Sequence, residues 1–289
     1  MDEYLVLAIM ICICGVSFVI GLIVYAIKSK KGPVSAFSNV SVGEGTPLAL
    51  PSPSSKKGSA PWYIQSWSNP KSVSSGTDGL KVSYKTGAVG MSSGTGFKAN
   101  PSKSLPAESA SVSYSIYFPD SFDFRRGGKA GCGLCLGTKL YECDTGGEHS
   151  NSGGSVRVTW KENGQGVAYM YLPTQAPLSS QSAAFKAAAD DPDKSGIHIF
   201  AKSSLKFIKG GWNSVTLTVK LNSVSSSNGL LRLTINGVTE ELSDVVYRRD
   251  ASVKINTMVF ATFFGGSSKD YAPLKSETAT FKDFKFTAS

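Results

Sequence analysis

The sequence predicts an all-β fold, a β-sandwich of the jelly-roll type, and three observations support this prediction. Nine short runs are rich in Val, Ile, Thr, Tyr and Phe, and several of them alternate between apolar and polar residues as half-buried strands do. Stretches rich in Gly and Ser separate the runs, and strands do not alternate with helices as they would in a parallel sheet. No repeat of about 20–50 residues recurs, which disfavours a propeller or a solenoid.

The composition bounds the class of protein and its partners. Of the 289 residues 41% are hydrophobic and 18% are charged, which permits a packed core and excludes a coiled coil. The formal net charge of +9 favours polyanionic partners, which include nucleic acid, an anionic membrane surface and an acidic polysaccharide. Two His and five Cys exclude a multi-zinc array and a disulfide-dense small scaffold.

The first element along the chain is a predicted transmembrane helix, within an anchor segment over residues 1–28. Residues 4–27 carry no charge, and a helix of that length spans about 36 Å, enough to cross a bilayer. A cleaved signal peptide is the competing interpretation, but the start of the chain is acidic and the apolar run is too long for one. Lysines follow the span and none precedes it, which predicts a single-pass protein with its N-terminus outside and its C-terminal domain on the cytosolic side. A virion internal membrane would fit the same topology.

A flexible linker over residues 29–60 and one folded domain over residues 61–289 are predicted to follow. The linker is rich in Pro, Ser, Gly and Lys and has no sustained apolar period. Asn228-Gly229 and Asn236-Gly237 are dipeptides typical of hairpin turns, and a short helix is predicted within residues 179–191. The predicted strands of the domain cover residues 80–85, 111–118, 155–160, 167–172, 197–201, 212–221, 230–235, 253–264 and 278–286.

Reactive side chains concentrate between residues 117 and 173. Ser155 and Arg157 are two apart on one predicted strand, and Tyr169 and Tyr171 are two apart on the next, so each pair points to one side of its strand. If the two strands pair, one sheet face displays a serine, an arginine and two phenols together.

This set of side chains suits β-elimination on a uronic acid. The reaction removes the C5 proton beside the carboxylate and expels the O4 substituent, and the proton becomes acidic enough only when Arg or Lys neutralises the carboxylate. Lys, His and Tyr can serve as the base and the acid, and the chemistry demands no metal or cofactor. Paired carboxylates, which a glycoside hydrolase needs, are not evident in this stretch. The competing interpretation is a polar sheet face without catalysis.

Several motifs occur in the order in which a known family has them. They are Y-F-P-x-x-F-D-F at 117–124, G-G-K at 127–129, G-G at 146–147, S-x-R-x-x-W at 155–160, Y-x-Y-L-P at 169–173, G-W at 211–212, N-G at 236–237, F-F-G-G at 263–266, Y-A-P at 271–273 and F-K-D-F at 281–284. On these motifs residues 110–289 resemble polysaccharide lyase family 14, the alginate- and glucuronan-lyase-like proteins, and residues 60–110 resemble it weakly. The resemblance suggests a large DNA virus of algae or protists as the source.

The resemblance implies a jelly-roll fold and a role for each matched side chain. The implied catalytic residues are Lys129, Tyr169, Tyr171 and His149, and the candidates for substrate binding are Ser155, Arg157 and Arg125. The run A-G-C-G-L-C-L-G at 130–137 departs from the family, which has a Leu-Pro-Gly-Leu run ending in Gly-Gly there. We expect this run to be a loop that shapes the subsite beside the catalytic lysine.

The cysteines leave three interpretations open. The resemblance implies a disulfide between Cys135 and Cys143. A zinc site of Cys132, Cys135, Cys143 and His149 is a second possibility, and free thiols are a third. We favour the bridge over zinc because the C-x-x-C pair lacks a second matching pair, although a disulfide fits poorly with a cytosolic domain.

Two functions from different classes are compatible with these observations. The first is a membrane-tethered lyase that cleaves or binds an acidic polysaccharide. The second is a non-catalytic structural or adhesion protein, such as a virion membrane or minor capsid protein with capsid or membrane-protein partners. We favour the lyase, because a fold retained only as a scaffold need not keep five polar positions of the site. No nucleic-acid partner is expected, since charge alone points to one and no matching motif is present.

Overall fold

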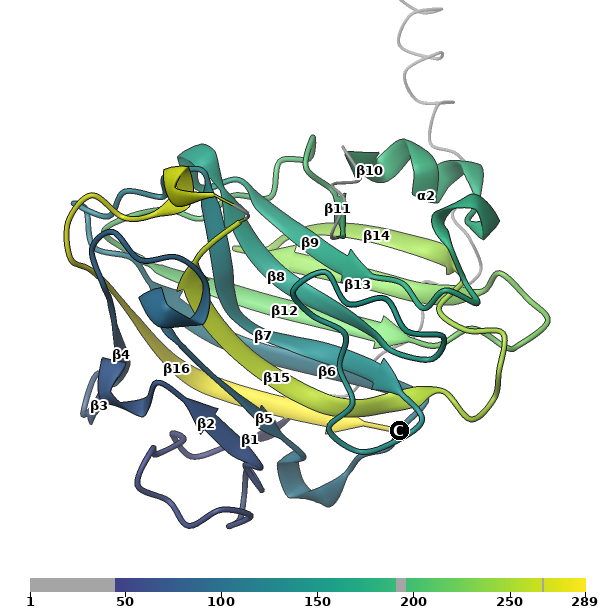
Figure 1. Ribbon diagram of the computed structural model, residues 1–289, viewed down its shortest axis with the longest axis horizontal. Coiled ribbons are helices and arrows are strands. Elements are labelled where there is room, and N and C mark those ends of the chain that lie inside the picture. The colour runs from purple at the N-terminus through teal and green to yellow at the C-terminus, as the bar shows by residue number, and fades with distance from the viewer. Residues whose placement is uncertain (1–44, 191–195, 267) are drawn as a thin grey trace, which may run out of the picture. The chain divides into compact units, whose positions relative to one another are not determined.

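The computed structural model describes residues 45–190, 196–266 and 268–289, which form a sandwich of two antiparallel sheets (Figure 1). Sheet A contains β14 (Val238–Val245), β13 (Gly229–Ile235), β12 (Trp212–Lys220), β6 (Ser109–Tyr117), β16 (Glu277–Ala288), β4 (Gly79–Tyr84) and β3 (Val73–Gly76) in that order, with β1 (Thr46–Pro47) paired to β16. Sheet B contains β10 (Ala189–Asp190), β11 (Ile197–Ile199), β9 (Gly166–Tyr171), β8 (Gly154–Lys161), β7 (Gly127–Gly137), β15 (Lys254–Phe264), β5 (Thr95–Ala99) and β2 (Ser66–Ser68). The prediction of an all-β sandwich is confirmed.

Helical structure in the described residues is confined to short connections. The α-helix α2 (Ala183–Ala188) lies within the predicted helical patch, and the Ser182 side chain caps it by accepting a hydrogen bond from the Phe185 amide. Single 3-10 turns are η1 (Pro70–Ser72), η2 (Gly90–Ser93), η3 (Pro101–Lys103), η4 (Glu162–Gly164), η5 (Leu178–Ser180) and η6 (Lys269–Tyr271). None of these described helices is long and apolar enough to cross a membrane. The anchor predicted over residues 4–27 lies outside the described residues.

The segment assigned to the linker contributes partly to the sandwich. In the described residues 45–60, Thr46 pairs with Phe286 of β16 and Leu48 is buried. The Trp62 indole nitrogen donates a hydrogen bond of 2.7 Å to the Ala49 carbonyl. Packing against the core therefore begins N-terminal to residue 61, because apolar residues spaced among prolines suffice to seat this segment on the edge of sheet A.

The strand β7, at the centre of sheet B, replaces the loop expected over residues 130–137. It pairs with β8 on one side and with β15 on the other. Its glycines accommodate large neighbours: a Cβ on Gly128 would lie 2.3 Å from the Trp160 ring, and one on Gly133 would lie 3.1 Å from the Arg157 side chain. The prediction of a loop was wrong because glycine lowers strand propensity, whereas close approach across the sheet requires it here.

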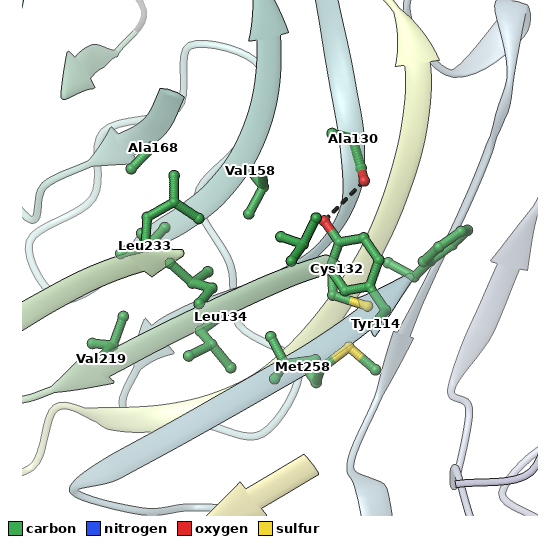
Figure 2. Packing of buried hydrophobic residues seen from close by; sticks show 14 of the residues in the cluster. Tyr114, Ala130, Cys132, Leu134, Val158, Ala168, Val219, Leu233 and Met258 are labelled. Carbon is green, nitrogen blue, oxygen red and sulfur yellow. Dashed lines mark hydrogen bonds between the residues drawn. The ribbon is translucent and has the colours of Figure 1, made fainter. Parts of the chain in front are cut away.

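The core lies between the two sheets and includes buried hydrogen bonds that join them, between Tyr84 and Thr262 and between Tyr114 and Ala130. Figure 2 shows the Tyr114 ring packed beside Cys132, with Leu134 and Met258 nearby. Tyr114 belongs to sheet A, and its hydroxyl donates a hydrogen bond of 2.9 Å to the Ala130 carbonyl of β7 in sheet B. Burial raises the pKa of the Tyr114 phenol well above its ordinary value, so the hydroxyl keeps its proton at neutral pH.

Removing this hydroxyl should destabilise the fold measurably. We expect Tyr114→Phe to lower the free energy of unfolding by about 1–3 kcal/mol, because the buried Ala130 carbonyl loses its side-chain donor. Urea denaturation followed by tryptophan fluorescence measures the change. Tyr117→Phe on the same strand is the control, since Tyr117 is partly exposed. Equal stability of the Tyr114→Phe variant and the natural chain would show that this bond contributes nothing.

Candidate functional site

The outer face of sheet B brings together most of the predicted site residues. The strands β8 and β9 pair antiparallel, with Ser155 opposite Tyr171 and Arg157 opposite Tyr169. The conditional prediction is therefore confirmed: one sheet face carries the serine, the arginine and both tyrosines. The inward residues of the same strands, such as Val156 and Met170, belong to the core.

Lys129 and the two tyrosines form the centre of this face. The Lys129 ammonium nitrogen lies 3.9 Å from the centroid of the Tyr169 ring, and the hydroxyls of Tyr169 and Tyr171 are 3.3 Å apart. Lys129 reaches this place because β7 pairs it with Thr159 of β8. A pocket of about 160 Å³ opens beside these groups, and its lining includes Lys129, Thr159, Tyr169, His198, Lys161 and Tyr271. We call this pocket and the adjoining outer face the Lys129 groove.

Arg157 places a buried positive charge in the floor of the groove. Only 7% of its surface is exposed. One guanidinium nitrogen donates to the Cys143 sulfur at 3.4 Å, and the buried Nε has no hydrogen-bond partner among the described residues. Burial lowers the pKa of Arg157 to about 10, opposed by Tyr171, Tyr169 and Glu148, so the group remains charged at neutral pH. A buried cation with an unused donor favours an anionic ligand above it.

Lys98 and His198 also belong to this region, although the sequence did not single them out. Lys98 of β5 is half-buried and donates a hydrogen bond of 2.9 Å to the Tyr141 carbonyl. Its pKa is lowered by burial and further by the Arg157 charge, while Glu148 opposes the shift. The His198 ring lies 4.8 Å from the Tyr169 ring, because β11 pairs with β9 and sets these residues opposite each other. Both residues reach the site through the order of strands in the sheet, which the sequence alone did not reveal.

The loop over residues 138–153 borders the groove, and a disulfide and several hydrogen bonds hold it in place. Cys135 and Cys143 form a disulfide, the pair that the family resemblance implied. The Ser155 side chain is fully buried, and its hydroxyl donates a hydrogen bond of 2.9 Å to the Asp144 carbonyl. In this geometry Ser155 holds the loop in place, so the predicted contact between its hydroxyl and a substrate would require the loop to move.

The zinc interpretation of the cysteines does not agree with the fold. Cys132 points into the core, whereas Cys135 packs on the outer side of the sheet with Cys143. Residues three apart on a strand face opposite sides, which prevents the C-x-x-C pair from sharing one ion. Among the described residues no group of three or more His, Cys, Asp or Glu could hold a metal ion. Cys132 is buried and forms no disulfide within the described part of the chain, and burial raises the pKa of its thiol.

His149 and Arg125 lie at the margins of the site. His149 is exposed on the 138–153 loop, with its ring 6.0 Å from the Tyr171 ring. Arg125 precedes β7, and its guanidinium lies 3.8 Å from the Asp123 carboxylate and donates to the Asp270 carbonyl. It lines a different, larger pocket with Asp120 and Lys206, so the structure does not bring it together with Lys129.

Comparison with known proteins identifies the family. The family model named polysaccharide lyase 14 matches residues 72–284. The chain belongs to the polysaccharide lyase 14 family. The resemblance drawn from the motifs is thereby confirmed, and the match extends through residues 72–110, where the motifs resembled the family only weakly.

Proteins similar to this polysaccharide lyase 14 chain include a curated viral protein and two alginate lyases of known structure. Exolysin of Paramecium bursaria Chlorella virus 1 is 26% identical over 175 residues, which are 55% of this chain and 26% of exolysin. The chain thus spans about a quarter of the length of that curated relative. The alginate lyase from Aplysia kurodai is 26% identical with a TM-score of 0.71, and the alginate lyase vAL-1 from a Chlorella virus is 24% identical with a TM-score of 0.70. Each superposition covers 86% of this chain and 100% of the other.

Loss of the disulfide should destabilise this lyase-family domain. The bridge joins residues eight apart in the sequence. Closing a loop of this size lowers the conformational entropy of the unfolded chain, which stabilises the fold by about 2–3 kcal/mol. We expect the double variant Cys135→Ser, Cys143→Ser to unfold at a lower temperature in calorimetry. The natural chain measured with a thiol reductant is the control and should behave as the variant does. An unchanged transition under both conditions would contradict a stabilising bridge.

Proposed function

We propose that this chain cleaves uronate polysaccharides by β-elimination in the Lys129 groove. The observation that carries the proposal is the contact of the Lys129 ammonium with the Tyr169 ring, beside a pair of phenols 3.3 Å apart and above the buried Arg157. The family match supports it, as do the names of relatives described as alginate lyases.

The charges of the groove suit the first requirement of the reaction. A uronate carboxylate bound over Arg157 would meet a cation that burial has already stripped of solvent, with the half-buried Lys98 nearby. Neutralising the carboxylate stabilises the negative charge that develops when the C5 proton leaves.

Proton transfer is assigned to Lys129 and Tyr169. Lys129 first releases its ammonium proton to solvent and then, as the neutral amine, takes the C5 proton; the electrons of the C5–H bond form the C4–C5 double bond, and the C4–O4 bond breaks. The Tyr169 phenol donates its proton to the departing O4, and Tyr171 lies within hydrogen-bond reach of that phenol. The products are a new reducing end and an unsaturated uronate. His198 and Thr159 border the same pocket, and the His198 ring centroid lies 4.8 Å from that of Tyr169.

The test is the appearance of the unsaturated product. The full-length chain is incubated with polymannuronate, polyguluronate and polyglucuronate, and ultraviolet absorbance is followed with time. A rise with one of these polymers establishes β-elimination and names the substrate class. A folded chain that gives no rise with any of them over a range of pH would contradict the proposal and favour the non-catalytic structural role.

We also propose that residues 4–27 tether the lyase domain to a membrane. The support is the uncharged run of that length in the sequence. The expressed full-length chain should sediment with membranes, remain there after alkaline carbonate treatment and be released by detergent. Release by carbonate alone would contradict an integral anchor.

A further inference from the structure

The outer face of sheet A lies on the opposite side of the sandwich from the Lys129 groove and has a distinct surface. Hydroxyl side chains cover it, alternating along each strand with buried core residues. They include Ser111, Ser113, Ser115, Ser214, Thr216 and Thr280. Neighbouring strands thus present rows of donors and acceptors to solvent, which favours hydrogen bonding with polar ligands.

A large aromatic side chain is exposed at one end of this face. Trp212, the first residue of β12, is 39% exposed. Tyr117 of β6 lies opposite it in the sheet, with the two ring centroids 5.6 Å apart. The Lys282 ammonium nitrogen lies 4.2 Å from the centroid of the Trp212 ring. An indole held in place by a phenol and a lysine is a rigid apolar surface with a cation beside it.

These side chains border two adjoining pockets. The first, of about 360 Å³, is lined by Thr77, Asp78, Tyr117, Trp212, Thr280 and Lys282. The second, of about 500 Å³, shares Thr77 and Lys282 with the first and adds Lys285 and Asp283. A continuous path therefore leads from Trp212 past Lys282 to Lys285, and an extended ligand could follow it.

We propose that this path is a second binding site for an acidic polysaccharide, separate from the Lys129 groove. The apolar face of a sugar ring would pack on Trp212, and its carboxylate would meet the ammonium of Lys282. The Asp78 carboxylate and the Thr280 hydroxyl can bind sugar hydroxyls at the rim of the first pocket. We call this set of residues the Trp212 site.

The second pocket favours an acidic glycan over a neutral one, because two lysines and one carboxylate line it. Lys282 and Lys285 both line the second pocket, and a uronate chain carries a carboxylate on each sugar that could meet them in turn. The carboxylate of Asp283 already accepts a hydrogen bond of 3.0 Å from the Ser115 hydroxyl. The binding of a uronate polymer, as opposed to another polyanion, rests on the proposed function of the Lys129 groove.

Two sites on opposite faces would change how the domain acts on a polymer. One stretch of polysaccharide held at the Trp212 site keeps other stretches at high effective concentration near the Lys129 groove. Short oligosaccharides that reach only one site gain nothing from this arrangement. The Trp212 site should therefore matter for polymers and gels and be neutral for short substrates.

The experiment compares binding and cleavage in the full-length chain. Binding to immobilised polyuronate is measured in a Lys129→Ala background, so that the polymer stays intact, with and without Trp212→Ala or Lys282→Ala. Each second substitution should weaken binding by about threefold to tenfold. Trp212→Phe, which keeps a ring, should weaken binding less, and Lys220→Ala, an exposed lysine at the far end of β12, should bind as the background does. With the natural Lys129 present, Trp212→Ala should leave cleavage of a short oligouronate unchanged.

The outcomes separate this inference from the proposed function. Trp212-dependent binding in a chain that cleaves no substrate would overturn the lyase assignment and retain the Trp212 site. Binding that is unaffected by both Trp212→Ala and Lys282→Ala would overturn the site, whether or not the chain cleaves. Equal binding to a neutral glucan, with no effect of Lys282→Ala, would overturn the acidic specificity.

Discussion

The Lys129→Ala variant should lose about 10²–10⁴-fold of the rate at which the chain forms unsaturated uronate. The substitution removes the group assigned to take the C5 proton, whereas the Tyr169 phenol, the Tyr171 phenol and the buried Arg157 all remain. The loss should fall on kcat with little change in KM, because a group that acts in proton transfer contributes mainly to the transition state. Initial rates on the polymer that the natural chain cleaves best provide the measurement.

Two further variants distinguish the role of Lys129 as a base from the effect of its positive charge. Lys129→Arg keeps the positive charge but cannot give up a proton near neutral pH, so we expect it to be as inactive as the alanine variant. Tyr169→Phe keeps the ring that Lys129 contacts and removes the acid, and it should also lose most of the rate. An arginine variant that retained most of the activity would show that Lys129 acts through its charge alone and would refute its role as base.

Several of the strands that the sequence predicted are ones in which polar and apolar residues alternate. β6 and β12 have a clear period of two, and both were found close to their predicted ends. β7 escaped prediction because five of its eleven residues are glycine, and its strand conformation depends on partners on both sides. β14 has no consistent apolar face, and it was missed although the turn at Asn236-Gly237 that precedes it was recognised. In both cases pairing within the sheet overrides weak local propensity.

The sequence predicted those parts of the site that follow from the spacing of residues within a strand. A separation of two residues placed Arg157 beside Ser155, and the pairing of neighbouring strands brought in Tyr169. Spacing could not show that Ser155 is buried and holds a loop, since burial depends on the segment that folds over it. Nor could it reveal Lys98 or His198, which enter through strands that are neighbours in the sheet but distant in the chain.

A substitution in the aromatic core at the end of the sandwich should cause a large loss of stability. Phe118 follows β6 and is fully buried. Its ring centroid lies 4.6 Å from that of Phe122, 5.0 Å from that of Phe124 and 5.6 Å from that of Phe207. We expect Phe118→Ala to lower the free energy of unfolding by about 3–5 kcal/mol, because it leaves a cavity that rigid rings cannot close. Urea denaturation measures the loss, and Phe118→Leu, which fills part of the space, should cost less.

The same substitution separates stability from catalysis. Phe118 also contacts Trp160, at 5.7 Å between ring centroids, and Trp160 lines the pocket of the Lys129 groove. Trp160 has further contacts that the substitution leaves in place, since its indole nitrogen donates a hydrogen bond of 3.0 Å to the backbone carbonyl of Phe124 and its ring packs on Phe264. At low temperature, where the variant remains folded, kcat should therefore stay near the natural value while the unfolding midpoint falls. A fall in kcat as large as that of Lys129→Ala, in fully folded protein, would show instead that core packing sets the geometry of the groove.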